Sequence, residues 1–192
     1  MGKICAVFGG SQGIGKAVAE LLARKGCHLA IIARNLEVAQ NTARGLGAGH
    51  LALSCDVSRE QEVQRAFEEI QRNLGPINYL VNAAGINRDG LLLRTKTEDM
   101  VSQIHTNLLG TMLTCKAAVK SMIHHQGGAI VNIGFIHTEM TAHLEEDELK
   151  KAIPLGRFGD PHEVAQAVLF LLESPYVTGS TLIVDGGLQL LI

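Results

Sequence analysis

A glycine-rich turn near the start of the chain carries the clearest chemical signal. Gly9, Gly13 and Gly15 follow an apolar run, residues 4–7, and lead into a helical pattern whose apolar positions start at Ile14. A strand that ends in such a turn and opens a helix leaves backbone N–H groups unpaired at the helix N-terminus, where the helix dipole also favours negative charge. The turn therefore predicts a phosphate-binding site, with a plain strand-to-helix turn as the alternative.

Three later positions bear on which phosphate ligand would fit. Arg34 stands 19 residues after Gly15, where a dinucleotide-binding fold that prefers NAD places an acidic residue for the ribose 2′-hydroxyl. A cation there suits the 2′-phosphate of NADP, although a solvated surface arginine is the alternative. Asp56 would either bond the adenine or start a turn. The small residues 83–85 would let a ribose approach the backbone, unless they form an ordinary loop.

The elements that must position these residues alternate along the chain. Short apolar runs predict strands over residues 4–7, 29–33, 51–55, 79–81, 129–133 and 181–184, and helical patterns fall between them, one of them running from about 95 to 125. This alternation predicts a doubly wound α/β fold, a parallel sheet whose ligand crevice lies at the carboxyl ends of its strands. No internal repeat or linker argues for a second domain, so residues 1–192 are predicted to form one domain.

Cap signals predict where some of the helices begin. Ser58 with Gln61 has the spacing of a capping box, and so has Thr95 with Glu98. Asp160 precedes a proline at the first position of a predicted helix over residues 161–172. A further helix is predicted over residues 145–153.

The composition is that of an ordinary globular protein. Of 192 residues, 46% are hydrophobic and 19% charged, with a net charge of −2, so no basic excess favours nucleic acid. The longest apolar runs, such as residues 167–172, are much shorter than the ~20 residues of a membrane span. The N-terminus does not look like a cleavable secretory signal. The four cysteines are widely spaced, which predicts buried apolar residues rather than a metal site or disulfides: Cys5, Cys27, Cys55 and Cys115.

Several motifs spread over nearly the whole chain form one further pattern. They are the glycine turn 8–15, Asp56-Val57, residues 82–85, Asn107, and segments 154–159, 178–179 and 184–187. In these segments the sequence resembles the short-chain dehydrogenase/reductase family, and within it the 3-oxoacyl-(acyl-carrier-protein) reductase group. The resemblance implies NADPH as cofactor and reduction of a 3-oxoacyl thioester or a quinone. It also implies a homotetramer or a hetero-oligomer with a related subunit, and a place in the mitochondrial matrix, or otherwise in the cytoplasm.

The resemblance also implies which residues contact the cofactor. Two departures from the family pattern occur in the glycine turn: Phe8 replaces a threonine, and Gln12 replaces a basic residue that often supports the 2′-phosphate, which weakens the preference for NADPH without reversing it. The implied contacts are Gly9, Ser11, Gln12, Gly13, Ile14 and Gly15 around the phosphates, Arg34 and Asn35 at the 2′-phosphate, Asp56 at the adenine, Ala83, Ala84 and Gly85 at the ribose, and Ile136, His137 and Thr138 on the nicotinamide side.

Most of the residues that the family uses for catalysis are missing. Such enzymes reduce a carbonyl with a tyrosine as proton donor, and a lysine four residues on lowers the pKa of this tyrosine. A serine after the fifth strand and an asparagine assist. Asn107 matches the last of these. The chain has two tyrosines, and Tyr79 is followed at that spacing by Ala83 and Tyr176 by Ser180, so no Tyr-x-x-x-Lys exists.

The missing residues point to an internal deletion. Phe135 stands where the family serine is expected, and residues 135–141 resemble the segment that normally follows a sixth strand. A helix–strand unit is therefore predicted to be absent at about 134/135, as in a spliced form. His137 has neither a lysine partner nor an orienting serine, and it is not expected to replace the tyrosine.

The deletion has functional and structural consequences. It predicts a catalytically impaired reductase, with a non-catalytic subunit that pairs with intact family members, or an unstable splice product, as alternatives. Residues 181–184 must pair directly with the fifth strand or stay loose. Leu109, Met112 and Leu113 are expected to lose cover.

Overall fold

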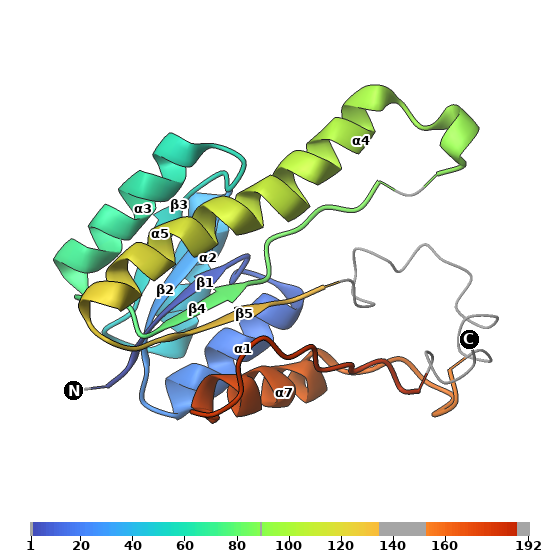
Figure 1. The fold of residues 1–192 in the computed structure, drawn as a ribbon. Helices are drawn as coiled ribbons and strands as arrows, with labels where there is room; N and C mark the ends of the chain where they lie inside the picture. Colours follow the sequence, from blue (N-terminus) through green and yellow to red (C-terminus); the bar gives the residue numbers. More distant parts are fainter. Residues whose placement is uncertain (1, 89, 135–152, 188–192) are drawn as a thin grey trace.

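The computed structural model describes residues 2–88, 90–134 and 153–187, and within them five parallel strands form one sheet (Figure 1). In chain order these are β1 (Ile4–Phe8), β2 (His28–Ala33), β3 (Leu51–Ser54), β4 (Tyr79–Asn82) and β5 (Ala129–Asn132). Their order across the sheet is β3-β2-β1-β4-β5. From β1 the chain adds β2 and β3 on one side, and it then returns to the other side of β1 to add β4 and β5, as in a Rossmann-type fold. The predicted doubly wound α/β fold is confirmed.

Helices cover both faces of this sheet. They are α1 (Gly13–Arg24), α2 (Leu36–Leu46), α3 (Glu60–Asn73), α4 (Thr97–Gln103), α5 (Gly110–His124) and α7 (Pro161–Glu173). Side chains alternate between the faces of a strand, so Cys5 and Val7 of β1 pack with α1, α2 and α7, whereas Ala6 and Phe8 pack with α3 and α5. The result is one domain with an apolar core on each side of the sheet.

Strand register brings the carboxyl ends of the central strands to one level. Phe8, the last residue of β1, pairs with Ile32 in β2 and with Asn82 in β4, and Asn82 pairs with Asn132 in β5. The residues that follow these strands therefore meet at one edge of the sheet. This edge is the predicted location of a ligand crevice.

The long helix predicted from about 95 to 125 is divided in the structure. A 3₁₀ turn, η1 (Leu92–Arg94), precedes α4, and a π-helical segment, η2 (Ile104–Leu109), separates α4 from α5. Asn107, which the sequence nominated as a catalytic residue, lies in η2. Single π turns inside helices commonly occur at functional sites, because they change the direction in which side chains point.

Two of the three cap predictions are wrong. The Ser58 hydroxyl donates to the Asp56 carboxylate and the Thr95 hydroxyl to the Leu91 carbonyl, so neither caps a helix. The adjacent helices α3 and α4 begin one or two residues later, without side-chain caps. The prediction for α7 is confirmed, because Asp160 accepts from the His162 N–H and the Glu163 side chain bonds back to the Asp160 N–H.

Of the two alternatives for residues 181–184, direct pairing with β5 or remaining loose, the structure shows the second. Residues 181–184 lie outside the sheet, and Leu182, Ile183 and Val184 are 45%, 53% and 40% exposed. No strand in the described part of the chain pairs with the outer edge of β5. Leu109 and Met112 are exposed, as expected, but Leu113 packs against the core. The helix predicted at 145–153 lies outside the described residues except for its last position.

None of the described helices combines the length and the apolar character that a membrane crossing requires.

Candidate cofactor-binding site

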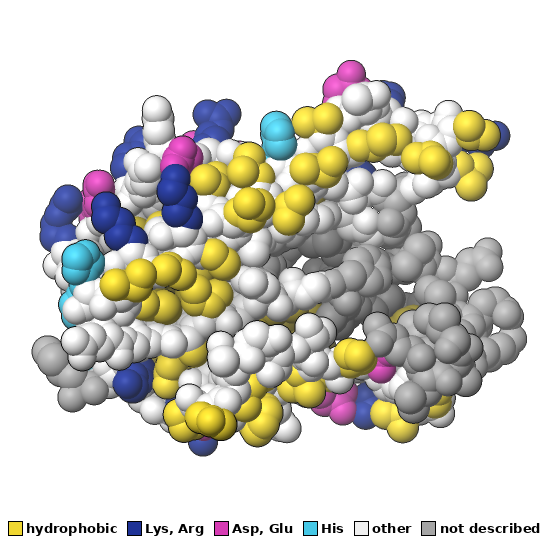
Figure 2. Space-filling model, viewed as in Figure 1, with side chains coloured by type: hydrophobic (Ala, Val, Ile, Leu, Met, Phe, Trp, Pro, Cys, Tyr) yellow, Lys and Arg dark blue, Asp and Glu magenta, His cyan; other side chains and the backbone are white. Residues whose placement is uncertain are grey.

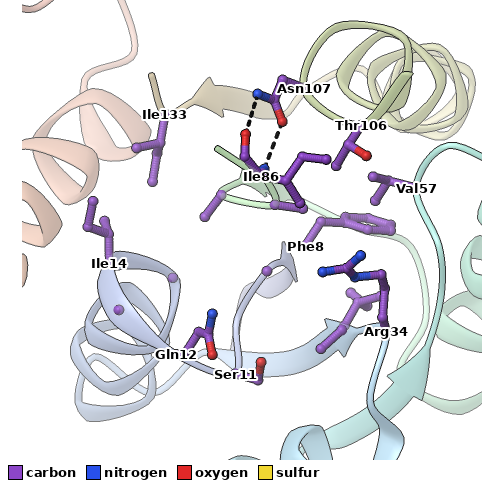
Figure 3. A pocket seen from close by; sticks show the side chains of 18 of the residues that line it. Phe8, Ser11, Gln12, Ile14, Arg34, Val57, Ile86, Thr106, Asn107 and Ile133 are labelled. Atoms are coloured by element: carbon purple, nitrogen blue, oxygen red, sulfur yellow. Dashed lines mark hydrogen bonds between the residues drawn. The ribbon is translucent and has the colours of Figure 1, made fainter. Parts of the chain in front are cut away.

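A crevice of about 480 Å³ opens at the carboxyl ends of the central strands (Figure 3). Its walls come from the glycine turn, the ends of β2 and β3, residues 83–87, the π-helical segment η2 and the end of β5. Segments distant in the sequence thus line one cavity because the strand register places their ends together.

The glycine turn allows three backbone segments to approach closely. Gly9 has φ +80°, and its N–H donates to the Ile32 carbonyl at 2.8 Å. A Cβ at Gly9 would lie 2.6 Å from the backbone of Ala83, and a Cβ at Gly15 would clash with the Gly9 carbonyl oxygen. Only glycine fits both positions, so α1 can begin directly beside the loop that follows β4.

The N-terminus of α1 is open to a ligand. Gln12, its N-cap residue, makes no side-chain cap hydrogen bond, and the first turn of the helix contains no acidic residue. The first N–H groups of a helix have no carbonyl partner within it, and they carry the positive end of the dipole. This end of α1 faces the crevice with the chemistry that a phosphate requires.

Arg34 provides a positive charge beside the glycine turn. Its side chain extends along the crevice wall next to Phe8 (Figure 3), and no carboxylate in the described part of the chain pairs with it. The next residue, Asn35, instead has a local task, because its Oδ1 accepts from the Glu37 and Val38 N–H groups at the start of α2. Of these two neighbouring residues, Arg34 is therefore the one whose side chain remains available to an anion.

Asp56 both lines the crevice and starts a turn. Its Oδ1 accepts from the Ser58 N–H at 3.0 Å and from the Ser58 hydroxyl at 2.7 Å, which is an Asx turn. The turn expected at Asp56 is confirmed, and a bond from Asp56 to the adenine stays a prediction.

Cys55, which precedes Asp56, also lines the crevice. Burial is the main cause that raises the pKa of the Cys55 thiol to about 12, and the carboxylates of Glu62 and Asp56 add to the shift. The thiolate, the reactive form, is therefore disfavoured. Cys5 and Cys27 are buried as well, as predicted from the sequence, whereas Cys115 is only half-buried.

Asn107 joins the π-helical segment to the loop after β4. Its Oδ1 accepts from the Ile86 N–H and its Nδ2 donates to the Ile86 carbonyl, both at 2.9 Å (Figure 3). The backbone at Gly85 passes close by, since a Cβ there would lie 3.4 Å from the Asn107 Oδ1. Both ends of this amide are thus engaged in holding the loop.

A buried polar cluster that sequence reasoning missed fixes the strand ends. The Asn82 amide donates to Asn132 at 2.9 Å and accepts from the Thr114 hydroxyl at 2.8 Å, which links β4, β5 and α5. Asn82 and Thr114 are both buried. An asparagine at the end of a central strand was the available signal, because a buried amide needs partners.

The structure brings together every described residue that the sequence nominated. The following line the crevice: Gly9, Ser11, Gln12, Gly13, Ile14, Gly15, Arg34, Asn35, Asp56, Ala83, Ala84, Gly85 and Asn107. Ile136, His137 and Thr138 lie outside the described residues.

Comparisons with known proteins agree with this architecture. A family model described as short chain dehydrogenase matches residues 3–145, and one described as enoyl-(acyl carrier protein) reductase matches residues 132–189. Among solved structures, one titled ribose-5-phosphate isomerase, from Brucella melitensis, superposes with a TM-score of 0.92 at 28% identity, covering 98% of this chain and 93% of that one.

Similar proteins of known name include reductases. The human 3-oxoacyl-(acyl-carrier-protein) reductase is 56% identical over 237 aligned positions, covering 100% of both chains. Carbonyl reductase family member 4 of Danio rerio is 52% identical over 238 positions, with the same coverage. A 3-oxoacyl-(acyl-carrier-protein) reductase of Vibrio cholerae is 31% identical, covering 99% of this chain and 98% of its own.

The length of these alignments exceeds the length of the chain. Because 192 residues cannot fill 237 positions, at least 45 positions of the human alignment lie opposite gaps in this chain. The identity nevertheless extends over both ends of the sequence. With a family model over most of its length and full-length relatives above 50% identity, the chain belongs to the short-chain dehydrogenase family.

Proposed function

We propose that this chain binds NADPH in the crevice but is impaired in the reaction of its family, the reduction of a 3-oxoacyl thioester, a quinone or another carbonyl. The names of its relatives, 3-oxoacyl-(acyl-carrier-protein) reductase and carbonyl reductase family member 4, support the substrate class. The absence of Tyr-x-x-x-Lys from the sequence supports the impairment.

The cofactor proposal rests on one structural combination. The uncapped N-terminus of α1 and the guanidinium of Arg34 line the same crevice, and Gly9 and Gly15 occupy positions that a Cβ would obstruct. We expect the N-terminus of α1 to hold the pyrophosphate and Arg34 to hold the adenosine 2′-phosphate. The residues present therefore fit the adenosine side of NADPH.

Impairment follows from what reduction requires. The bound nicotinamide supplies hydride, but a proton donor must stand beside the carbonyl oxygen to accommodate the developing charge. Tyr79 begins β4 and thus lies at the opposite end of that strand from the crevice, and burial is the main cause that raises its pKa. Tyr176 is fully exposed after α7 and is not part of the crevice wall. Neither has a lysine four residues on.

We attribute the missing donor to an internal deletion at about 134/135. At least 45 positions of the human relative have no counterpart in this chain, and the two family models overlap at residues 132–145, beside the proposed junction. An element of this size could contain the serine loop, a helix and a strand. We also place the chain in the mitochondrial matrix by its family resemblance, which fractionation of expressing cells would test.

An assay with purified protein of confirmed mass tests the proposal. Protein whose intact mass matches 20.6 kDa should not oxidise NADPH in the presence of a 3-oxoacyl thioester or an o-quinone. Turnover well above the enzyme-free blank would overturn the impairment. A thermal shift with NADPH that exceeds the shift with NADH supports the cofactor, whereas a folded protein that responds to neither would contradict it.

A specific observation favours a second candidate, a non-catalytic subunit that pairs with intact family members. Hydrophobic side chains gather along α4, η2 and α5 (Figure 2), and Leu108, Met112 and Ile123 are 58%, 58% and 70% exposed. Exposed apolar surface of this kind marks association sites. Co-purification with an intact relative would support this role, in a homo- or hetero-oligomer. Failure of the purified chain to unfold cooperatively would instead indicate the third alternative, an unstable splice product.

A further inference from the structure

β3 is the most weakly packed strand at one edge of the sheet. In the described part of the chain it pairs with β2 and with no other strand. Leu51, Ala52 and Leu53 are half-buried and Ser54 is exposed, whereas four of the five residues of β1 are buried. Elements with few buried apolar contacts open locally at a lower free energy than the core. The contacts that hold β3 to β2 therefore decide how often this edge opens.

A histidine side chain extends the pairing of β2 and β3 where β3 begins. Leu29, near the start of β2, is fully buried, and its backbone N–H donates to His50 Nδ1 at 3.1 Å. His50 directly precedes β3, whose first residue, Leu51, pairs with Ala30. The His50 ring therefore provides the acceptor for a buried N–H that lies just before the first residue pair of the two strands.

This bond requires the neutral form of His50. A ring nitrogen accepts from an N–H only when it carries no proton itself, so the proton of neutral His50 is on Nε2. Protonation of Nδ1 would turn the acceptor into a second donor that faces the Leu29 N–H. A buried N–H without an acceptor is destabilising. The link between β2 and the start of β3 therefore exists only while His50 is neutral.

The surroundings of His50 also disfavour its charged form. Burial is the main cause that lowers the pKa of His50 from its ordinary 6.5, and His28 adds to the shift, whereas the Leu46 backbone acts in the opposite direction. His28 is the first residue of β2, and its own Nδ1 lies 3.2 Å from the Gly49 carbonyl. In that contact the ring nitrogen donates, so protonation preserves it. Arg44, the basic residue in the last turn of α2, bonds a carbonyl of its own helix instead.

We infer that His50 is a pH-sensitive switch at the edge of the sheet: its neutral ring holds β3 against β2, and its protonation releases the strand. This goes beyond the proposed function, because it involves no ligand. The other end of β3 reaches the crevice. There the Ser54 hydroxyl donates to the Arg34 carbonyl at 3.0 Å. The Cys55 N–H donates to the Ala33 carbonyl, also at 3.0 Å. Release of β3 therefore extends to the crevice wall, which includes Arg34 and Cys55.

Native-state hydrogen exchange, expressed as protection factors, measures this opening. A lowered histidine pKa gives stability that is fully present above pH 6.5 and is lost as the pH falls below it. Between about pH 7.5 and about pH 5.5, the protection of the Leu29 and Cys55 N–H groups should fall about threefold to tenfold, because one histidine contributes at most about a factor of ten over this range. The Ala129 N–H, which donates to the Asn78 carbonyl at 2.9 Å on the opposite edge strand, should keep its protection.

Matched histidine variants assign the effect to His50. His50→Asn places an amide oxygen near the position of Nδ1, so it keeps an acceptor for the Leu29 N–H but cannot be protonated in this pH range. The protection of the Leu29 and Cys55 N–H groups should then no longer depend on pH. His28→Asn changes the neighbouring exposed histidine, whose ring donates rather than accepts, and should keep the wild-type dependence.

Nitrogen NMR of the wild-type chain gives a test that needs no variant. Long-range proton–nitrogen spectra at about pH 7.5 should show the proton of His50 on Nε2, and a proton on Nδ1 would overturn the inference. Protection of the Leu29 N–H that does not change with pH would also overturn it. A change at Leu29 without one at Cys55 would refute the release of β3 as a strand. Loss of the pH dependence in both histidine variants would refute the assignment to His50.

Discussion

Asn107 and Ile86 are joined by a reciprocal pair of hydrogen bonds, each 2.9 Å long, between one side-chain amide and one backbone residue. The pair connects the π-helical segment η2 to the loop after β4, two parts of the crevice wall that are 21 residues apart. Asn107, the residue that the sequence nominated for a catalytic role, is therefore bound into the wall of the crevice. Its structural task in this chain is to position the loop.

Removal of this amide should loosen the loop. We expect Asn107→Ala to lower the free energy of unfolding by about 1 kcal/mol, because each net hydrogen bond contributes about 0.5–1.5 kcal/mol and this one is exposed. Amide hydrogen exchange at Ile86 should become faster. Asn73→Ala is the control, since the Asn73 amide bonds only Glu69 of its own helix. Unchanged protection of the Ile86 N–H in Asn107→Ala would contradict this role.

Substitution in the glycine turn should affect both fold and binding. Gly9→Ala forces a side chain into φ +80° and against the Ala83 backbone, 2.6 Å away. The left-handed conformation alone costs about 1–2 kcal/mol, so we expect a loss above about 2 kcal/mol in urea denaturation, together with loss of NADPH binding. Gly45→Ala, in α2 with no atom within 4 Å of its Cβ, should instead stabilise by about 0.5 kcal/mol. Equal effects of the two changes would refute this steric explanation.

The limits of prediction from the sequence follow the range of the interactions involved. Continuous apolar runs located all five strands to within a residue or two, because buried parallel strands need such runs on both faces. The caps at Ser58 and Thr95 failed because each hydroxyl found a nearer partner, the Asp56 carboxylate and the Leu91 carbonyl. Local spacing cannot decide such competition.

The same distinction applies to the site. Strand ends and glycines placed the crevice correctly, since the fold alone determines where parallel strands end. The bonds of Asn107 to Ile86 and of Asn82 to Thr114 depend on contacts across 21 and 32 residues, together with a π turn that no local pattern marked. Residues 181–184 have the pattern of a strand, but they lie outside the sheet although the outer edge of β5 is unpaired among the described residues.

Stability should decline at alkaline pH through buried thiols. Burial raises the pKa of Cys55 from the ordinary 9.0 to about 12, so the folded state keeps its proton while the unfolded chain loses it. A raised pKa gives stability that is fully present below pH 9 and is lost as the pH rises towards 12. In Cys55→Ala, the urea midpoint should therefore fall less steeply between pH 9 and pH 12. Val57→Ala, a nearby buried change without a titrating group, should keep the wild-type slope, and a steep slope in both would exclude Cys55 as the cause.

Acid should weaken the start of α7. Arg157 donates to both carboxylate oxygens of Glu163 at 2.8 and 2.7 Å, and with the Asp160 N–H it lowers the pKa of Glu163 from 4.5 to about 2. A lowered pKa gives stability that is present above pH 4.5 and is lost as the pH falls towards 2.

Carboxyl carbon NMR would follow this titration directly. Arg157→Met should raise the pKa of Glu163 towards 4.5, because it removes the main partner of the charged form. Arg72→Met breaks the exposed pair with Glu69 on α3 and should leave the Glu163 titration where it was. A Glu163 pKa near 4.5 in the wild-type chain would argue against this ion pair in solution.

Self-association should depend on the unpaired segment at residues 181–184. The outer edge of β5 has no strand partner among the described residues. Ile183, in the strand-like segment 181–184, is a β-branched residue that is 53% exposed. Open edges and exposed β-branched residues favour pairing between chains, and lysine suppresses it because its charge resists burial. Ile183→Lys should therefore reduce the mass-average sedimentation coefficient of a concentrated sample. Gln64→Lys adds the same charge on the exposed face of α3 and should leave the sedimentation coefficient unchanged. An equal reduction of the sedimentation coefficient in both variants would trace the effect to net charge rather than to this segment.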